Sequence, residues 1–421
     1  MKKKRVLPEG WHEVTIGDKF KTGSGGTPLS TNRDYYEGGS IPWINSGELN
    51  ENYIDRTDNY ITELGLNNSS AKIFPKGTVL LAMYGATAGK TSLLKIDACT
   101  NQAICAILEN HEYSNLFLKY NLENLYEYLV NFSSGSARDN LSQEGIAELT
   151  LYFPDGKAFQ EKLIKVLEKI DQKIILNTRM NAELEAMAKQ LYDYWFVQFD
   201  FPDENGKPYK SSGGKMVYNP TLKREIPAGW EVKGLGDVLT FSNGINYEKG
   251  IEGDKEYKII NVRNITSSSV YINKSELDTI SLPSKQAGNY LIEENDIIIA
   301  RSGTPGSTRL IDNPIDVIYC GFIIKGSPID SAYKYYVMFF LKQLEGTQAT
   351  KTGGSILQNV SQETLKSLNL VLPGKHLFTT FNEKIKALFT LLNKKQDENN
   401  ELTHLRDSLL PMLMNGQVTV E

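Results

Sequence analysis

The sequence predicts an α+β protein in which a mixed α/β head and a long helix occur twice. Three observations predict this fold class. The chain carries an internal duplication, each copy begins with short β-rich runs between glycine-rich turns, and each copy ends in an apolar stripe with helical spacing. A chain of 421 residues with 40% hydrophobic and 23% charged residues can bury the cores of two or three domains.

Four segments of the first half of the chain return in the same order in the second half. PEGWHEVTIGD, from Pro8, is matched by PAGWEVKGLGD, from Pro227, and IPWINSGEL is matched more loosely by YKIINVRNI. GTVLLAMYGATAGKTSLL is matched by NDIIIARSGTPGSTRLI, and GSARDNLSQEGIAELTLYFP by GSILQNVSQETLKSLNLVLP. Two copies are too few for a solenoid, so we expect two pseudo-symmetric units related by a two-fold axis, as in a dimer.

The two heads are predicted at residues 1–155 and 226–373. Buried strands are predicted in the runs TVLLAMY, QAICAIL and DIIIAR, and turns in GSGGTP, EGGS and SSGS. Helical patches at residues 115–130 and 332–344 complete an α+β arrangement with many polar loops.

A long helix is predicted after each head, at residues 156–199 and 374–415, because apolar residues recur there at spacings of three and four. About forty residues of helix span about 60 Å, and residues 416–421 remain as a tail. Each buried Leu or Ile stabilises by roughly 1.5 to 3 kcal/mol, so the two stripes are expected to pack on one another. The expected helix–helix contacts are Phe159, Leu163, Val166, Ile170, Ile174, Leu184, Met187, Leu191, Phe381, Ile385, Leu388, Leu392, Leu402, Leu405 and Leu409.

Polar residues interrupt both stripes midway, at Asn177, Thr178 and Asn181 in the first helix and at residues 393–400 in the second. Such a break lowers the stability of an apolar seam but can fix the register of the two helices. The alternative is that these turns are frayed or face solvent. Between the copies, residues 200–225 are rich in Gly, Pro, Ser and Lys and are predicted to form an ordered turn followed by a linker.

The loop MYGATAGKTSLL, residues 83–94, has the composition of a phosphate-binding loop but not its spacing. Such a loop needs four residues between its glycines, and only three separate Gly85 from Gly89. The second copy has SGTPGSTR here, without a Gly-Lys pair. Both copies share a buried strand and a Gly/Ser/Thr turn that ends in a cation, Lys90 or Arg309. Such a turn can present backbone N–H groups and a charge to a phosphodiester, and an ordinary strand-ending turn is the alternative.

Composition argues against several classes of site. The three cysteines and four histidines are scattered, so neither a disulfide framework nor a metal site is expected. No stretch approaches the roughly 18 apolar residues of a membrane span, and no apolar run follows the basic start MKKKR. We therefore expect a soluble, cytoplasmic protein without membrane contact. Because the net charge is −5, DNA binding would need local basic patches or basic partners.

An enzymatic role is not expected for this chain. A methyltransferase that acts on adenine holds the flipped base with an Asn/Asp-Pro-Pro-Tyr/Phe loop, and the nearest string is DNPI at residues 312–315. No glycine fingerprint of a cofactor-binding fold follows a predicted strand. We expect no catalytic residues and no cofactor bound by this chain.

The order head, helix, head, helix resembles the specificity subunit of type I restriction-modification enzymes over essentially the whole chain. The starts of the heads carry this likeness at Gly10, Trp11, Gly17, Asp18, Gly229, Trp230, Gly236 and Asp237. Gly-Ser…Ser-Gln-Glu…Pro segments close both heads. The most specific feature is NAELEAMAKQLYDYWFVQFDFPDENGKPYKSSGGKMV, which is similar to the central conserved region of many such subunits.

The resemblance implies two target-recognition domains separated by an antiparallel two-helix coiled coil that acts as a ruler. Each head would read one half of a split, asymmetric site in double-stranded DNA, with half-sites about one helical turn, roughly 34 to 36 Å, apart. The implied partners are two modification subunits, which bind S-adenosylmethionine, methylate adenine and dock on the helices. Restriction subunits, which hydrolyse ATP and translocate DNA, would join the full complex.

Base readout requires polar and basic side chains on loops that can enter the major groove. Recognition domains of this family diverge, so the candidates follow from residue type and loop position alone. In the first head they are Thr22, Ser24, Thr27, Arg33, Asn45, Ser46, Tyr84, Lys90, Ser136, Arg138 and Asn140. Their counterparts in the second head are Asn243, Asn246, Tyr247, Asn261, Arg263, Asn264, Arg301, Ser302, Thr304, Arg309, Ser355 and Gln358.

Neither head is basic, since residues 1–155 contain 14 Lys and Arg against 19 Asp and Glu, and residues 226–373 contain 14 against 16. Non-specific affinity for DNA grows with the number of phosphates that a protein neutralises. We therefore expect weak DNA binding by the chain alone and tight binding once modification subunits clamp the duplex. The alternative function is that of a coiled-coil adaptor whose heads bind proteins and do not read DNA.

Overall fold

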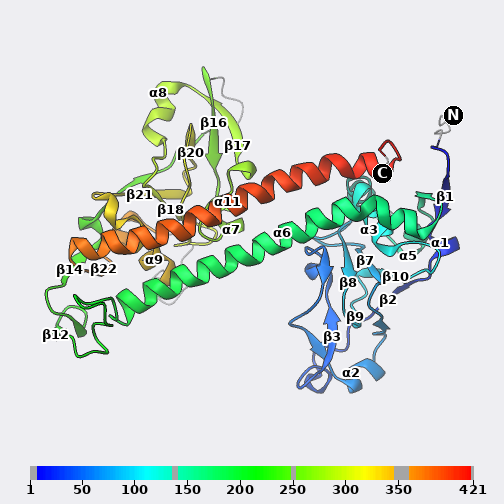
Figure 1. The fold of residues 1–421 in the computed structure, drawn as a ribbon, viewed down its shortest axis with the longest axis horizontal. Helices are drawn as coiled ribbons and strands as arrows, with labels where there is room; N and C mark the ends of the chain where they lie inside the picture. Colours follow the sequence, from blue (N-terminus) through cyan, green and yellow to red (C-terminus); the bar gives the residue numbers. More distant parts are fainter. Residues whose placement is uncertain (1–6, 135–140, 248–252, 346–359, 419–421) are drawn as a thin grey trace. The chain divides into compact units, whose positions relative to one another are not determined.

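The chain divides into two compact units, each described here in a computed structural model (Figure 1). Unit 1 comprises residues 1–175 with 401–421, and unit 2 comprises residues 176–400. The globular part of unit 1 is called head 1, and that of unit 2 is called head 2. The residues that the structure describes are 7–134, 141–247, 253–345 and 360–418.

The described residues of head 1 form three sheets. Its strands are β1 (Trp11–Thr15), β2 (Thr22–Ser24), β3 (Ile41–Ile44), β4 (Tyr53–Ile54), β5 (Tyr60–Ile61), β6 (Ile73–Phe74), β7 (Val79–Ala82), β8 (Thr91–Leu94), β9 (Ala98–Thr100), β10 (Ile104–Ile107) and β11 (Thr150–Pro154). Its short helices are α1 (Ile16–Lys19), η1 (Arg33–Tyr35), η2 (Ser46–Glu48), α2 (Glu63–Asn67), α3 (Asn115–Asn124), α4 (Tyr126–Ser134) and α5 (Gln143–Ala147). The sheets have the orders β2-β10-β7-β8-β4, β5-β3-β9-β6 and β1-β11.

Head 2 is built in the same way. Its strands are β12 (Met216–Asn219), β13 (Arg224–Pro227), β14 (Glu231–Gly234), β15 (Leu239–Asn243), β16 (Lys255–Ile260), β17 (Asp278–Leu282), β18 (Ile297–Ala300), β19 (Thr308–Arg309), β20 (Val317–Tyr319), β21 (Ile323–Pro328) and β22 (Asn369–Leu372). Its short helices are η4 (Leu235–Asp237), α7 (Val262–Ser267), η5 (Lys274–Glu276), α8 (Ser284–Ala287), η6 (Gly288–Tyr290), η7 (Ser331–Tyr333), α9 (Lys334–Gln343) and α10 (Gln362–Lys366). The sheets have the orders β15-β21-β18-β19, β17-β16-β20, β14-β22 and β12-β13.

The central strands of the two heads have the same order, which confirms the duplication. The antiparallel order β2-β10-β7-β8 of head 1 is that of β15-β21-β18-β19 in head 2, and the parallel pair β3 with β9 corresponds to β16 with β20. The pair β1 with β11 corresponds to β14 with β22. The runs predicted as buried strands form β7, β10 and β18, whose residues are fully buried because sheet and helices cover both faces.

A close backbone approach is also repeated in the two heads. A Cβ atom on Gly25 would lie 1.9 Å from the carbonyl oxygen of Thr100, and one on Gly244 would lie 2.1 Å from that of Cys320. Both distances are far below van der Waals contact, so each position accepts only glycine without a shift of the backbone. The glycine-rich start of each head therefore allows the first strand of the sheet to pass directly beside the turn before β10 or β21.

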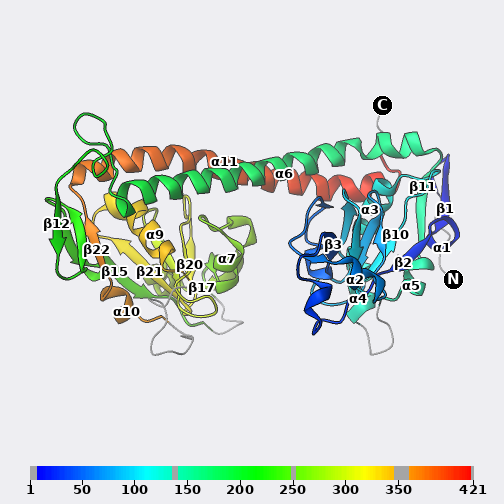
Figure 2. The ribbon, with the colours of Figure 1, turned by 90° about the horizontal axis from the view of Figure 1, so that it is seen from below.

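Each head is followed by a long helix. Helix α6 (Lys157–Tyr192) continues as a π-helical turn over Asp193–Val197, and helix α11 (Lys375–Met414) contains Pro411 near its end. In unit 1, α3 lies between the sheet and α6, and in unit 2, α9 lies between the sheet and the helices α6 and α11 (Figure 2). No helix among the described residues is long and apolar enough to cross a bilayer.

In unit 1, the first part of α6 and the last part of α11 belong to the core of head 1. Leu163, Ile164 and Leu167 of α6 are buried in one cluster with Leu413 and Met414 of α11. The aromatic side chains of α3 join the same cluster. Within this unit, head 1 is therefore attached rigidly to both helices, because they contribute residues to its core.

In unit 2, the remainder of α6 packs antiparallel to the first part of α11. Asn177 contacts Asn399 at 2.9 Å, whereas Trp195 contacts Phe381 with ring centroids 5.8 Å apart. Contacts thus move toward the start of α11 as α6 proceeds, which is the antiparallel pairing that the resemblance implied.

The polar interruption of the seam is buried and paired, so the alternative of a frayed or solvent-facing turn does not hold at its centre. The Asn177 amide donates to Glu398 Oε2 at 3.0 Å and to Asn399 Oδ1 at 2.9 Å. The Asn399 amide donates to Thr178 Oγ1 at 3.3 Å. Asn177 is fully buried, so its two bonds hold α6 and α11 in one register within unit 2.

Burial separates the predicted seam residues into three groups. Leu163, Ile170, Leu184, Phe381, Ile385 and Leu392 are buried, and Val166, Ile174, Leu191, Leu388, Leu402 and Leu409 are partly exposed. Phe159, Met187 and Leu405 are 38%, 54% and 49% exposed, so the prediction that these three line the buried seam is wrong. A spacing of three and four fits two neighbouring stripes of a long helix, and the tertiary structure buries only one. Other residues of the two helices are buried although they were not predicted: Gln160, Ile164, Leu167, Asp171, Ala188, Tyr192 and Phe389. Some of them face a head and not the other helix, since Gln160 bonds to Ser114 and Pro154 of head 1, and Phe389 packs on aromatic rings of head 2.

Residues 200–225 form an ordered turn, as predicted, but the second part is not a linker. Strands β12 and β13 pair in an antiparallel hairpin, with Met216 opposite Pro227. The ring of Tyr209 stacks on Phe201 with centroids 4.6 Å apart, and Phe201 stacks on Trp230 at 5.1 Å. Composition suggested flexibility, but these aromatic contacts attach the segment to the core of head 2.

Candidate nucleic-acid interface

The loop between β7 and β8 of head 1 is held against η2. Thr87 Oγ1 donates to the carbonyl of Ser46 at 2.7 Å, and Lys90 Nζ donates to Asn50 Oδ1 at 2.5 Å. Tyr84, near the start of the loop, is exposed. Ser46 is thus brought beside the loop that carries Tyr84 and Lys90, although it lies about forty residues earlier in the sequence.

The loop between β18 and β19 of head 2 is held against α7 in the corresponding way. Thr266 Oγ1 and Thr304 Oγ1 lie 3.4 Å apart, and a Cβ atom on Gly303 would lie 2.9 Å from Val262 Cγ1. Gly303 has φ +77°, the left-handed region that favours glycine. The short helix after the parallel strand and the loop after the central strand therefore lie side by side in both heads.

An Asn precedes each of these short helices and fixes its start. The backbone N–H of Asn45 donates to Glu48 Oε1 at 2.9 Å, and that of Asn261 donates to Asn264 Oδ1 at 2.8 Å. The Asn264 amide also donates to the carbonyl of Glu276, and the residue is buried. Asn264 therefore stabilises the start of α7, and its prediction as a DNA contact is wrong.

Several backbone N–H groups of the two glycine loops already donate hydrogen bonds within the protein, so they are not available to bind a phosphate. The N–H groups of Ala88, Gly89 and Lys90 donate to carbonyls of the same loop and of β7. In head 2, the N–H groups of Thr304 and Gly306 are used in the same way. These loops can offer side chains to DNA, but the N–H groups named here are already engaged.

Arg309 does not end the head 2 turn as a free cation. Its guanidinium is buried and donates to the carbonyls of Ser268 and Thr308, both at 2.7 Å, and to Glu345 Oε1 at 2.9 Å. The prediction that it contacts DNA is therefore wrong. The reason is that Arg309 lies in strand β19 and its side chain reaches Glu345, just after the end of α9. Lys90 of head 1, in contrast, is partly exposed.

The other candidates differ in how much of their hydrogen-bonding capacity is used. In head 1, Thr22 accepts from Gln143 at 3.1 Å, Thr27 donates to Gln102 at 2.7 Å, and Arg33 lies 3.9 Å from Glu37. In head 2, Arg263 and Asn261 both donate to Asp278, at 2.5 and 3.0 Å. Asn243 and Asn246 are exposed, whereas Ser24, Asn45, Tyr247, Arg301 and Ser302 are partly exposed. Ser136, Arg138, Asn140, Ser355 and Gln358 lie outside the described residues.

Three residues at the same edges were missed by the sequence reasoning. Asn50 accepts a hydrogen bond from Lys90, and Gln102 accepts one from Thr27. Phe322 is exposed on the turn before β21. Gln102 and Phe322 could have been nominated from the sequence, because the segments NQA (residues 101–103) and CGF (residues 320–322) occupy the same place in the two aligned copies.

A second apolar feature lies on the exposed faces of the long helices. In unit 2, Met187 and Tyr194 are exposed on α6, and in unit 1, Leu405 and Met412 are exposed on α11. Each pair is separated by seven residues, which is two helical turns, and the second pair lies 218 positions after the first. The exposed pairs therefore repeat with the duplication, although they are not part of the seam.

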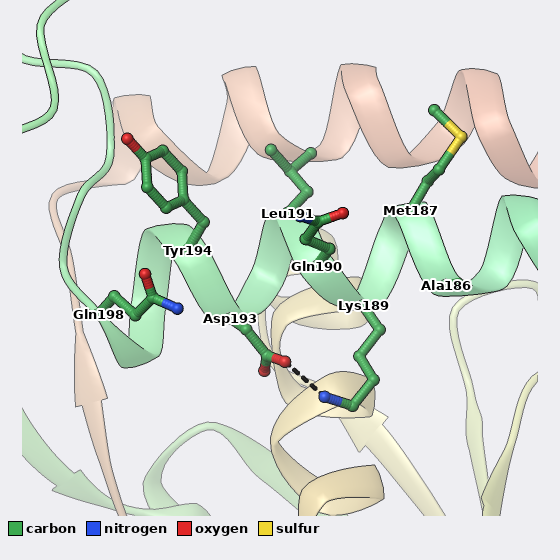
Figure 3. Close-up of a pocket in the computed structure, with 8 residues that line it drawn as sticks. All are labelled: Ala186, Met187, Lys189, Gln190, Leu191, Asp193, Tyr194 and Gln198. Carbon is green, nitrogen blue, oxygen red and sulfur yellow. Dashed lines mark hydrogen bonds and ion pairs between the residues drawn. The ribbon is translucent and has the colours of Figure 1, made fainter.

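The exposed pair of unit 2 lines an open groove of about 630 Å³ on α6. Figure 3 shows Met187, Leu191 and Tyr194 projecting from one side of the helix, while Lys189 and Asp193 form an ion pair on another side. An apolar face beside a paired charge is suited to protein contact, because aromatic residues and Met are enriched at interfaces.

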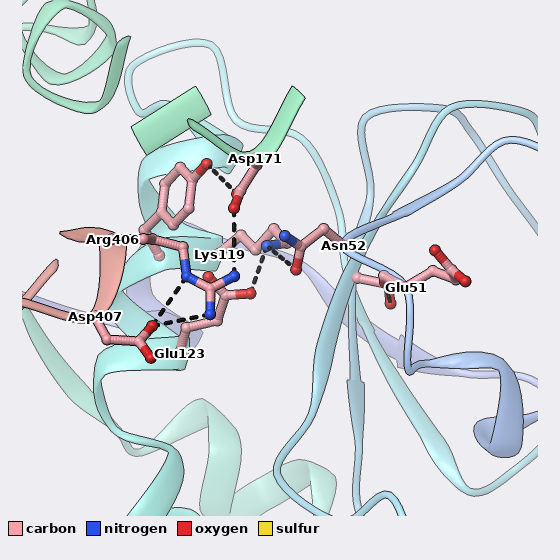
Figure 4. Close-up of polar contacts among 9 residues, drawn as sticks. Glu51, Asn52, Lys119, Glu123, Asp171, Arg406 and Asp407 are labelled. Atoms are coloured by element: carbon pink, nitrogen blue, oxygen red, sulfur yellow. Dashed lines mark hydrogen bonds and ion pairs between the residues drawn. The ribbon is translucent and has the colours of Figure 1, made fainter. Parts of the chain in front are cut away.

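A buried polar cluster joins head 1 to both helices within unit 1 (Figure 4). The Asp171 carboxylate of α6 is fully buried, accepts from the Tyr120 hydroxyl at 2.7 Å and lies 3.4 Å from Arg406 Nη1 of α11. Burial raises the pKa of Tyr120, and the nearby Asp171 raises it further. Beside them, Lys119 is buried and pairs with Glu123 at 2.5 Å. One carboxylate thus connects α3, α6 and α11.

Comparison with known proteins agrees with this architecture. The model of the type I restriction modification DNA specificity domain matches residues 8–186 and again residues 227–404. The MjaIX type I restriction enzyme specificity subunit of Methanocaldococcus jannaschii is 27% identical over 99% of this chain and 95% of its own length. The HindI specificity subunit of Haemophilus influenzae is 22% identical over 97% of this chain and 99% of its own length.

Among solved structures, the type I restriction-modification S subunit from M. genitalium shares the fold with a TM-score of 0.57 and 15% identity, covering 98% of both chains. The family model matches both copies and most of the chain. The duplicated heads, each followed by a long helix, and these matches show that the chain belongs to the specificity subunits of type I restriction-modification systems.

Proposed function

We propose that each head reads one half of a bipartite, asymmetric DNA site and that the paired helices set the spacing of the halves. The observation that carries this proposal is that the two heads repeat one scaffold but present different side chains on it. At the loop after the central strand, head 1 has Tyr84 and Lys90, whereas head 2 has Ser302 and Thr304. Because one backbone carries two sets of groups, the two half-sites should differ in sequence.

The chain itself is proposed to be non-catalytic and to act in the cytoplasm. Two modification subunits would bind S-adenosylmethionine and methylate adenine, and restriction subunits would add ATP-dependent translocation and cleavage. The exposed pairs Met187 with Tyr194 and Leu405 with Met412 support two equivalent docking positions, since they repeat with the duplication. A partner helix that covers each pair would bury apolar surface that the chain leaves in water.

Exchange of heads tests the readout. Head 1 or head 2 is replaced by the corresponding head of another specificity subunit, and methylated adenines are mapped after co-expression with the modification subunit. We expect each exchange to change one half of the recognised sequence and to leave the other half unchanged. Methylation that ignores the identity of the heads would contradict the proposal and would favour the protein-binding adaptor.

Charge substitution tests the docking positions. Met187→Glu and Leu405→Glu are each expected to remove one bound modification subunit, and the double variant is expected to remove both, because a carboxylate would have to be desolvated at the contact. Light scattering after size-exclusion chromatography measures the stoichiometry. Val217→Glu, in the hairpin β12–β13, changes an equally exposed residue outside the helices and should leave it unchanged. Full complexes from the double variant would refute this assignment.

A salt titration tests the role of the partners in affinity. The heads contain more acidic than basic residues, so the chain alone should bind DNA weakly and without strong sequence preference at physiological salt. The complex with modification subunits should bind tightly. Nanomolar, sequence-specific binding by the chain alone would overturn this expectation.

A further inference from the structure

An exposed phenylalanine occupies the end of head 2 where predicted DNA contacts gather. Phe322 is 61% exposed on the turn between β20 and β21, at the carboxyl ends of the parallel strands β16 and β20. Single exposed apolar residues are common and need no function by themselves. The place of Phe322 in the head, its rigid support and its absence from head 1 distinguish it from such residues.

The turn that carries Phe322 is fixed by hydrogen bonds on both sides. The N–H of Gly321 donates to the carbonyl of Ile245 at 2.7 Å, and the Phe322 carbonyl accepts from the N–H of Arg301 at 2.9 Å. The side chain of Asn246 lies directly against Gly321, since a Cβ atom there would be 1.9 Å from Asn246 Oδ1. The backbone that carries the aromatic ring is therefore fixed, because any shift of this turn would break hydrogen bonds to the neighbouring segments.

The neighbours of this ring have the chemistry of base readout. Arg301 and Asn246 are attached to the turn, and Ser302 and Thr304 follow Arg301 on the same loop. Among the described residues, the Arg301 guanidinium has no hydrogen bond or ion pair, and its charge acts on the exposed carboxylate of Glu363. An aromatic ring, a cation, an amide and two hydroxyls on one edge match the contacts that proteins make with base edges in the major groove.

Head 1 carries the same backbone at this position with different side chains. Its equivalent hydrogen bond joins the N–H of Met83 to the carbonyl of Ala103 at 2.8 Å, and the strand register around it is the same. Met83 and Ala103 are both buried. The position occupied by a cation and an exposed ring in head 2 is therefore closed and apolar in head 1.

We propose that Phe322 and Arg301 are specificity-determining residues of head 2, with the ring in apolar contact with a base of the second half-site and Arg301 donating to a neighbouring base or phosphate. This inference rests on the proposed DNA readout. It assigns the contact to one half-site only, because head 1 has no equivalent group. Apolar side chains read the thymine methyl in the major groove, and inserted rings can also unstack a base step.

The experiment uses the chain in complex with its modification subunits. Phe322→Ala and Arg301→Met remove the ring and the cation, and methylation rates are measured on DNA in which each base pair of both half-sites is varied. We expect Phe322→Ala to lower the rate on the cognate site about tenfold or more and to relax discrimination at one position of the second half-site. Arg301→Met should weaken methylation of the same half-site, and readout of the first half-site should not change.

Ile315→Ala is the matched control. Ile315 is 69% exposed and precedes β20, so it lies at the opposite end of the same strand, and its removal should have no effect. Thermal unfolding and complex assembly of the variants check that head 2 remains folded. If Phe322→Ala behaves like Ile315→Ala on every substrate, the inference is overturned while the proposed function stands. If the wild-type complex shows no bipartite recognition, the proposed function itself fails.

Discussion

The buried carboxylate of Asp171 should be the most sensitive polar position of unit 1. Asp171 is fully buried, and its side chain accepts one hydrogen bond from Tyr120 and faces Arg406 (Figure 4). Tyr120→Phe removes a single hydroxyl from a fully buried ring and leaves its packing unchanged. It therefore isolates one hydrogen bond to a charged group, made between α3 of head 1 and α6.

The size of the effect follows from the geometry. A hydrogen bond to a charged group contributes about 1.5 to 3 kcal/mol, and the 2.7 Å distance from Tyr120 to Asp171 indicates a well-formed one. Arg406→Met breaks the ion pair; because the distance is 3.4 Å and the Arg406 side chain is 26% exposed, we expect about 2 to 3 kcal/mol, below the 3 to 5 of a fully buried pair. The two losses should not add, because both changes act on the same carboxylate.

Hydrogen exchange provides the assay, because it reports local opening without requiring the whole chain to unfold in one step. A loss of 1.5 to 3 kcal/mol corresponds to roughly 10- to 150-fold faster exchange of protected amides in α3 and in the last turns of α11. Tyr60→Phe, at an exposed tyrosine of head 1, is the control and should change exchange less than about twofold.

An apolar replacement of the whole cluster should reverse the loss of stability. Replacing all three groups with apolar residues, as Tyr120→Phe with Asp171→Leu and Arg406→Met, should recover most of the stability, because none of the three positions then leaves a buried charge without its partner. A Tyr120→Phe variant that exchanges like the wild type would show that the carboxylate has other sufficient partners and would refute the assignment.

Four further outcomes are expected. Asn177→Leu should lower the free energy of unfolding of unit 2 by about 1 to 3 kcal/mol, because Glu398 and Asn399 each lose a hydrogen-bond donor. Adding Asn399→Leu should restore the stability. A single variant as stable as the wild type would contradict a role of Asn177 in fixing the register. Gly25→Ala and Gly244→Ala should each destabilise only the head that contains it, as measured by exchange, because either Cβ atom meets a carbonyl. The three cysteines should resist a thiol reagent at pH 8 until the protein unfolds, since burial raises the pKa of the thiols, to about 12 in one case; labelling of the native protein would refute this. Because burial raises the pKa of Tyr120, its neutral form should stabilise unit 1 below about pH 10 and this contribution should be lost at higher pH, so Tyr120→Phe should flatten the fall in unfolding temperature between pH 9 and 11.

Much of the architecture could be predicted because it repeats. The matches from Pro8 and from Pro227 predicted two heads, and the central strands of both heads have the same order. The change of apolar spacing after each head predicted α6 and α11. The polar interruption at Asn177 indicated either a register-fixing contact or a frayed turn, and the structure shows a buried pair that spans the seam. These features could be predicted because they depend on short stretches of sequence and not on contacts between distant segments.

The candidate site could be predicted only in outline. Residue type and loop position nominated Ser46, Tyr84 and Lys90, which the structure brings together in head 1. The same criteria nominated Arg309 and Asn264, which the structure buries. A polar side chain on a turn has the same local signature whether it faces solvent or stabilises the neighbouring turn, so partners that are distant in the sequence decide its role.

The sequence by itself determined that two similar heads alternate with two long helices, because duplication, turn residues and helical spacing are all local properties of the chain. Only the tertiary structure decided which of two adjacent helical stripes is buried, so that Met187 and Leu405 face solvent, and which ring of head 2 is presented at its polar edge. The physical reason is that burial depends on surfaces contributed by distant segments, and spacing along one segment does not specify them.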